Sequence, residues 1–139
     1  MSGQIINRQE KLRPDLGWLE DRLQVLLAEL AIMKPRLEVT LVDDQQISEL
    51  NRRYFAKNGP TNVISFPAKE DEFLGEVILS VETVRRETEP LGYSLEEGLL
   101  YYLIHGVLHL IGDEHVGVSA PVAAAMYARQ ENLFTKLLL

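Results

Sequence analysis

The chain has 139 residues, of which 46% are apolar, and a formal net charge of −7. This length and apolar content suffice for one hydrophobic core, so we expect residues 1–139 to form a single domain. The net acidity argues against general attraction to nucleic acid, and the absence of cysteine excludes disulfides and thiolate metal sites. A bound transition metal would therefore have to use His, Asp or Glu side chains.

The first half of the chain alternates strand and helix patterns. Residues 4–8 predict a short strand, and leucines at helical spacing from Leu16 to Leu30 predict an amphipathic helix. Alternating apolar residues at 37–42 predict a half-buried strand. Asp44 is expected to cap the helix that follows, which an Asn-Gly-Pro sequence then ends.

The middle of the chain contains two further strand patterns. Residues 62–66 are rich in β-forming side chains, and residues 75–81 predict a second strand. The charged residues 67–73 between them are expected to form a loop. Ser80 can cap a short helix after the second strand, which a proline then ends.

Two long helices complete the predicted fold. Ser94 and Glu97 have the spacing of a capping box, so a helix should begin at the next residue after Ser94 and stop at Gly112. A final helix is expected from about 119 to 138. Four strands and about five helices in mixed order indicate an α+β fold, in which a small mixed sheet is flanked by helices.

All three histidines of the chain lie within residues 105–115. His105 and His109 are four residues apart, so a helix presents both on one face, and a chain reversal at Gly112 would let His115 approach the same point. Three imidazoles suit one Zn²⁺ ion, although Ni²⁺, Cu²⁺ or Co²⁺ would also bind. A water activated by the metal would occupy the open coordination position and act as nucleophile near neutral pH.

The spacing HxxxHxxGxxH is that of the long zinc signature of metzincin proteases. A lone histidine in a helix is more often a hydrogen-bonded core residue than a ligand, but three at this spacing favour the metal. Gly106 occupies the position of the glutamate base of HExxH peptidases, which argues against peptidase chemistry and suggests room for a bulkier substrate beside the metal. Glu114 is the nearest carboxylate in sequence and the candidate general base.

Four blocks of the sequence resemble the bacterial YbeY family. HGVLHLIGDEH is similar to the family pattern HGxLHLxGYDH, and LNRRYFAKNGPTNVISFP is similar to LNxxYRxxDxPTxVLSFP. LGEVILSVETV resembles the family segment LGDIxIS, and MYARQENL resembles its last helix. The blocks follow in order and cover the chain from about Val39 to its end.

The resemblance implies a cytoplasmic, single-strand-specific metallo-endoribonuclease of 16S ribosomal RNA maturation and ribosome quality control. It implies one zinc ion bound by His105, His109 and His115, and a cleft beside it lined by residues 51–67. The implied partners are single-stranded RNA, 16S rRNA and the ribosome, with a ribosomal protein or GTPase as a further partner. No membrane partner is expected.

One basic segment stands out in this acidic chain. Residues 50–69 contain four Lys or Arg side chains and no acid, which would suit a phosphate backbone, although a solvated helix face is the simpler alternative. The Tyr-Arg pair of the family is replaced by Tyr54 and Phe55, so the expected arginine is absent. The candidate substrate-binding residues are therefore Arg52, Arg53, Lys57 and Ser65. Adjacent helical residues point about 100° apart, so only one of the two arginines should face the cleft.

Two further departures leave the mechanism open. The Tyr-Asp pair of the family is Asp113-Glu114 here, and its aspartate after Leu-Gly is Glu76, whose carboxylate could orient a ligand histidine or simply be solvated. The absent arginine supports an alternative function, a ribosome-associated RNA-binding factor with a structural or vestigial metal site. A hydrolase of another substrate class on the same three histidines is the second alternative.

Overall fold

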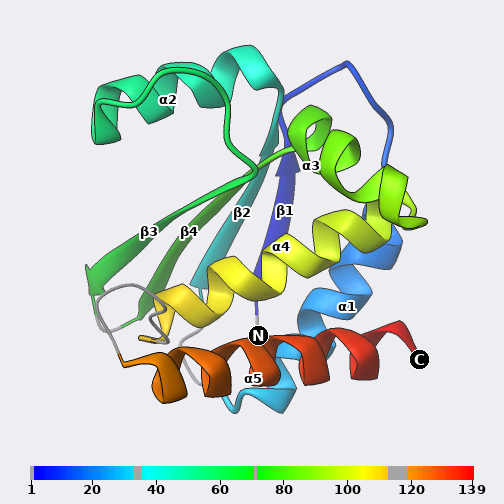
Figure 1. The fold of residues 1–139 in the computed structure, drawn as a ribbon, viewed down its shortest axis with the longest axis vertical. Helices are drawn as coiled ribbons and strands as arrows, with labels where there is room; N and C mark the ends of the chain where they lie inside the picture. Colours follow the sequence, from blue (N-terminus) through cyan, green and yellow to red (C-terminus); the bar gives the residue numbers. More distant parts are fainter. Residues whose placement is uncertain (1, 33–35, 71, 113–118) are drawn as a thin grey trace.

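The computed structural model describes residues 2–32, 36–70, 72–112 and 119–139. In these residues the chain forms a four-stranded mixed sheet with five α-helices and one short 3₁₀ helix, which confirms the predicted α+β class (Figure 1). The strands are β1 (Ser2–Asn7), β2 (Arg36–Val42), β3 (Val63–Glu70) and β4 (Phe73–Ser80). The helices are α1 (Leu16–Glu29), α2 (Asp44–Phe55), α3 (Val81–Thr88), η1 (Glu89–Leu91), α4 (Leu95–Leu110) and α5 (Ala120–Leu138).

The sheet has the strand order β1-β2-β4-β3. The first three of these strands are parallel, with Val39 of β2 between Ile5 of β1 and Val77 of β4. Parallel neighbours need a crossover connection, which α1 supplies between β1 and β2. β3 pairs antiparallel with β4 through a short turn and forms the edge of the sheet.

The two faces of the sheet are covered differently, because successive side chains of a strand point to opposite faces. Val77 and Leu79 belong to the main core with α1 and α4, whereas Ile78 packs in a smaller cluster with Ile47 of α2. Figure 1 shows α4 lying across the sheet, with α5 along its outer side and α2 at one end of the sheet. Helix α4 is therefore a central layer, and its side chains reach both the sheet and α5.

The predicted starts of α3 and α4 and the predicted stop of α4 at Gly112 are confirmed, whereas α3 ends at Thr88 and Pro90 lies in η1. Ser80 accepts a hydrogen bond from the backbone of Thr83, and Ser94 and Glu97 form both bonds of a capping box at the start of α4. Gly112 has φ of +98° and donates its N–H to the carbonyl of His109. This left-handed conformation is readily adopted by glycine, and it ends the helix one turn after the histidine.

The predicted cap of α2 is wrong by one residue. Asp43, not Asp44, caps the helix, and its carboxylate accepts from the backbone N–H of Gln46 at 2.9 Å. The Asp44 carboxylate instead accepts from Ser80 at 2.7 Å and from Arg86 at 2.7 Å, and also accepts a hydrogen bond from Thr83. Burial raises the pKa of Asp44, but these hydrogen bonds outweigh it and hold the pKa below its usual value. Asp44 thus connects α2 to α3.

The charged loop predicted at residues 67–73 is also wrong. β3 continues to Glu70 and β4 begins at Phe73, so most of this segment is a β-hairpin. An edge strand tolerates proline and charged side chains, because one of its sides faces solvent rather than another strand. Pro67, which pairs with Gly75, lies on such an edge.

Within the described residues, no helix is both long enough and apolar enough to cross a lipid bilayer. The last helix, predicted from about 119, begins at Ala120 and buries Gln130, Phe134 and Leu137. Phe134 and Leu137 join the main core. The remaining buried side chain, an amide, lies at the functional site described next.

Candidate active site in the histidine cleft

Helix α4 brings two of the three predicted metal ligands together. The ring centroids of His105 and His109 lie 4.7 Å apart, with the ring planes inclined by 56°. The predicted third ligand His115 and the candidate base Glu114 lie outside the described residues, and their roles stay predictions. Among the residues that the structure does describe, no three His, Asp or Glu side chains form a metal-binding group.

A buried amide on α5 fixes the orientation of one histidine. Gln130 is only 2% exposed, and its Oε1 lies 2.9 Å from Nδ1 of His105. Its amide group also hydrogen-bonds the hydroxyl of Tyr101. An amide oxygen can only accept a hydrogen bond, so His105 donates from Nδ1 and carries its lone pair on Nε2.

Tyr101 extends this hydrogen-bond chain to the surface. Its hydroxyl donates to Glu131 at 2.8 Å, and burial together with this bond raises the pKa of Tyr101 to about 12. The phenol thus stays protonated at neutral pH. Gln130 was not among the residues selected from the sequence, although its spacing to Phe134 and Leu137 places it on the buried stripe of α5.

The two histidines open into a cleft of about 290 Å³ between α4 and the segment from α2 to β3. Of the predicted substrate-binding residues, Lys57 and Ser65 line this cleft. Its described lining contains no carboxylate. The complete lining is Asn51, Phe55, Lys57, Thr61, Val63, Ile64, Ser65, His105 and His109.

Ser65 and Gly106 hold α4 close to the sheet. The Ser65 hydroxyl donates to the carbonyl of Gly106 at 3.1 Å. A β-carbon at position 106 would lie 2.7 Å from Cγ1 of Val77 and 3.1 Å from the Ser65 hydroxyl. Gly106 is buried against the sheet, so the suggestion that it makes room for substrate is wrong. The same contact leaves no space for a glutamate base at this position.

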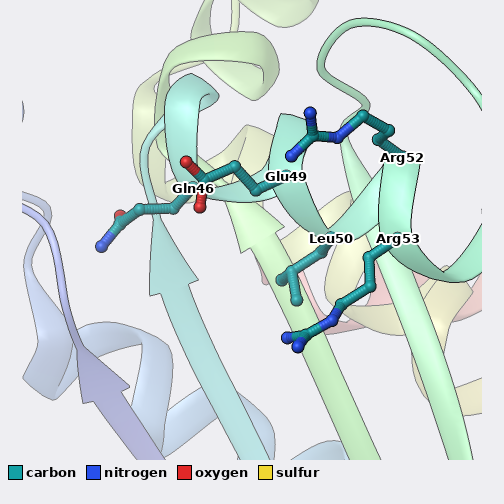
Figure 2. Close-up of a pocket in the computed structure, with 5 residues that line it drawn as sticks. All are labelled: Gln46, Glu49, Leu50, Arg52 and Arg53. Atoms are coloured by element: carbon teal, nitrogen blue, oxygen red, sulfur yellow. The ribbon is translucent and has the colours of Figure 1, made fainter.

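Arg52 and Arg53 do not line the histidine cleft. They line a different pocket on α2, together with Gln46, Glu49 and Leu50. Figure 2 shows their side chains diverging, with Arg53 on the side of Leu50 and Arg52 on the side of Glu49. The prediction that the two arginines point apart agrees with the structure, but neither lines the cleft, contrary to the expectation that one of them would. Among the described residues, Lys57 is the cation that lines the cleft.

Polar contacts fix the loop that carries Lys57 and Thr61. The amide of Asn51 donates to the carbonyl of Gly59 at 3.1 Å. At the other end of the loop, Glu87 accepts from the amide of Asn62 and from the hydroxyl of Tyr102, both at 2.9 Å. Burial and the bond to Glu87 raise the pKa of Tyr102 to about 12. The loop is therefore tied to α2, α3 and α4.

Glu76 lies away from the histidines. Strand alternation places it on the sheet face opposite Val77 and hence opposite α4. Burial and the neighbouring Glu38 raise its pKa. Glu76 is not among the described residues that line the cleft, and the contact suggested between its carboxylate and a ligand histidine is supplied by Gln130 instead.

Comparison with known proteins places this arrangement in a family. Residues 4–138 match the family model described as Endoribonuclease YbeY. The chain is 35% identical over 137 residues to the endoribonuclease YbeY of Syntrophus aciditrophicus, covering 94% of this chain and 86% of that protein. It is 38% identical over 112 residues to the endoribonuclease YbeY of Aquifex aeolicus, covering 78% of this chain and 73% of that protein. The solution structure of TM1509 from Thermotoga maritima matches with a TM-score of 0.68 at 25% identity, covering 96% of this chain and 89% of that one. The chain therefore belongs to the endoribonuclease YbeY family.

Proposed function

We propose that this chain is a metal-dependent endoribonuclease that cuts single-stranded RNA. Its substrate would be 16S ribosomal RNA, which it would cut during rRNA maturation and ribosome quality control. The observation that carries the proposal is the imidazole pair of His105 and His109 in a cleft whose described lining includes a lysine and no acid. Family membership supports the nuclease activity. We further propose that the chain works as one cytoplasmic domain on the ribosome, with a ribosomal protein or GTPase as partner.

The residues present fit a transition metal. Gln130 holds His105 in the tautomer whose Nε2 carries the lone pair, an arrangement typical of metal-binding imidazoles. We propose His105, His109 and His115 as the ligands of one Zn²⁺ ion, an all-nitrogen set that suits this metal. A bound ion would supply Lewis acidity and lower the pKa of water. Glu114 remains the candidate base.

The charges of the cleft suit a phosphodiester. The ammonium of Lys57 makes no ion pair with another described residue, and it lies in the same cleft as both histidines. It can therefore pair with a phosphate of the substrate, although it lacks the bidentate fork of the arginine typical of the family. Ser65 adds a hydroxyl oxygen that can accept a hydrogen bond from the substrate sugar.

The test is cleavage of an end-labelled single-stranded RNA beside a duplex of the same sequence. Wild-type protein should cut only the single strand, and EDTA should stop the reaction. His109→Ala should be inactive while its circular dichroism is unchanged. Lys136→Ala removes an exposed ion pair between α5 and Glu29 of α1, so it is the matched surface variant and should cut like wild type.

Metal content separates the remaining alternatives. Mass spectrometry should find one metal ion per wild-type chain and none in folded His109→Ala. If both proteins bind RNA and neither cuts with any divalent metal, the chain is an RNA-binding factor and the proposed activity is wrong. Equal cleavage by wild type and His109→Ala would also contradict the proposal.

A further inference from the structure

Three aromatic side chains form a cluster beside the histidine cleft. The Phe55 and Phe66 rings are nearly parallel, with centroids 6.1 Å apart, and Tyr54 meets Phe66 edge to face at 5.2 Å. Phe55 is 46% exposed and Tyr54 is 56% exposed, although both are large aromatics. Single exposed apolar residues are common, but a contiguous exposed cluster next to a site indicates binding. We call these three residues the aromatic platform.

The platform is continuous with the candidate active site. Phe55 lines the same cleft as His105 and His109, and Lys57 lines it two residues further along the chain. The guanidinium of Arg53 lies 6.0 Å from the Tyr54 ring, which adds a second cation at the platform. An exposed aromatic surface bordered by cations is the combination that binds single-stranded nucleic acid.

The platform is also rigid enough to hold a ligand in place. Phe66 is half-buried and packs on the cluster that includes Ile64 and Ile78, so the ring beneath Phe55 is fixed to the sheet. Phe55 is the last residue of α2, and Ala56 ends the helix in a left-handed conformation with φ of +54°. Ordering such a ring costs little further entropy when a base binds.

We propose that Phe55, supported by Phe66, is a stacking site for one nucleobase of single-stranded RNA, next to the phosphodiester at the histidines. This inference rests on the proposed function and names the substrate contact that replaces the arginine of the family. Lys57 would pair with the neighbouring phosphate. Stacking uses the face of a base, which a duplex hides, so the platform favours single strands over duplexes without selecting a base.

Binding can be measured without cleavage by fluorescence anisotropy of a labelled single-stranded oligonucleotide in EDTA. Phe55→Leu keeps an apolar side chain but removes the π face, and it should weaken binding to the single strand about tenfold while leaving duplex binding unchanged. Phe55→Trp should restore wild-type affinity. Tyr93→Leu is the matched control, because Tyr93 is also exposed and packs edge to face on Phe134, away from the cleft.

A second signal distinguishes stacking from a general loss of structure. In a Trp18→Phe background, Phe55→Trp carries the only indole of the chain, and its fluorescence should be quenched by the single strand but not by the duplex. Unchanged single-strand affinity in Phe55→Leu, or an equal loss for single strand and duplex, would overturn the inference. Quenching by an unrelated protein but not by RNA would overturn it as well and identify a protein-docking surface.

The outcomes separate this inference from the proposed function. If His109→Ala abolishes RNA cleavage but Phe55→Leu leaves both RNA binding and KM unchanged, the inferred stacking site is wrong and the nuclease assignment stands. If no metal supports cleavage yet Phe55→Leu weakens single-strand binding, the platform stands as an RNA-binding site and the nuclease assignment fails.

Discussion

Replacing Gly106 by alanine tests whether this position serves close packing of α4 on the sheet. The added β-carbon would lie 2.7 Å from Cγ1 of Val77, a distance that requires a shift of the helix or of the strand. Overpacking of this kind costs about 1–3 kcal/mol. Alanine in a helix interior gains about 1 kcal/mol over glycine. We therefore expect Gly106→Ala to lower the free energy of unfolding by about 0–2 kcal/mol.

Gly17→Ala is the matched control for helix propensity. A β-carbon at position 17 meets only the Asp15 carboxylate at 3.6 Å, an ordinary contact, so this variant should gain up to about 1 kcal/mol. Both variants can be compared by urea unfolding followed by circular dichroism. The expected difference between them is about 1–3 kcal/mol, which reports the steric cost at Gly106 alone.

A double-mutant cycle identifies the partner of the clash. Val77→Ala removes both γ-carbons that the new methyl would meet, so Gly106→Ala should become neutral or stabilising in that background. The packing argument is refuted if Gly106→Ala stabilises the wild-type chain as much as Gly17→Ala does. A stabilisation as large as that of Gly17→Ala together with a raised KM for RNA would instead restore the interpretation that the glycine makes room for substrate.

Two further predictions concern Gln130 and Asp44. Gln130→Met removes the acceptor for Nδ1 of His105 and should weaken metal binding about 10- to 100-fold in a chelator competition. Gln130→Glu keeps an acceptor and should retain the metal affinity. Equal metal affinity in both variants would contradict the positioning role of Gln130. The pKa of Asp44 is lower in the folded chain than its unperturbed 3.8, so its stabilising contribution is present above that value and is lost as the pH falls through the folded pKa. Asp44→Asn should therefore be less stable than wild type at pH 7, and the difference should shrink in acid; a difference independent of pH would show that the carboxylate charge is not what connects α2 to Arg86.

Local signals in the sequence determined the elements around the site. The capping box of Ser94 and Glu97 and the stop at Gly112 define α4 because each depends on contacts within one or two helical turns. The pairing of His105 with His109 follows from helix geometry in the same way. Alternation of apolar residues likewise predicted β2, and the β-forming side chains of residues 62–66 predicted the start of β3, since both are local patterns.

Two predictions made from local patterns of charged residues were wrong, the loop at residues 67–73 and the cap of α2. Residues 67–73 have the composition of a loop, yet most of them lie within β3 and β4, because an edge strand leaves polar side chains in solvent. The prediction of Asp44 as the cap of α2 is off by one residue. Asp43 is the cap, and Asp44 instead bonds to Arg86 of a helix far along the chain.

Only the tertiary structure decided which side chains share the cleft. Lys57 lies beside the histidines and Arg52 and Arg53 do not, because the direction of each side chain depends on how α2 packs on the sheet. Contacts across α4 were equally invisible in sequence: Gly106 meets Val77, and Gln130 reaches His105 from the last helix. Residues distant in the chain meet only through the packing of whole elements, so their juxtaposition is a property of the fold and not of any local pattern.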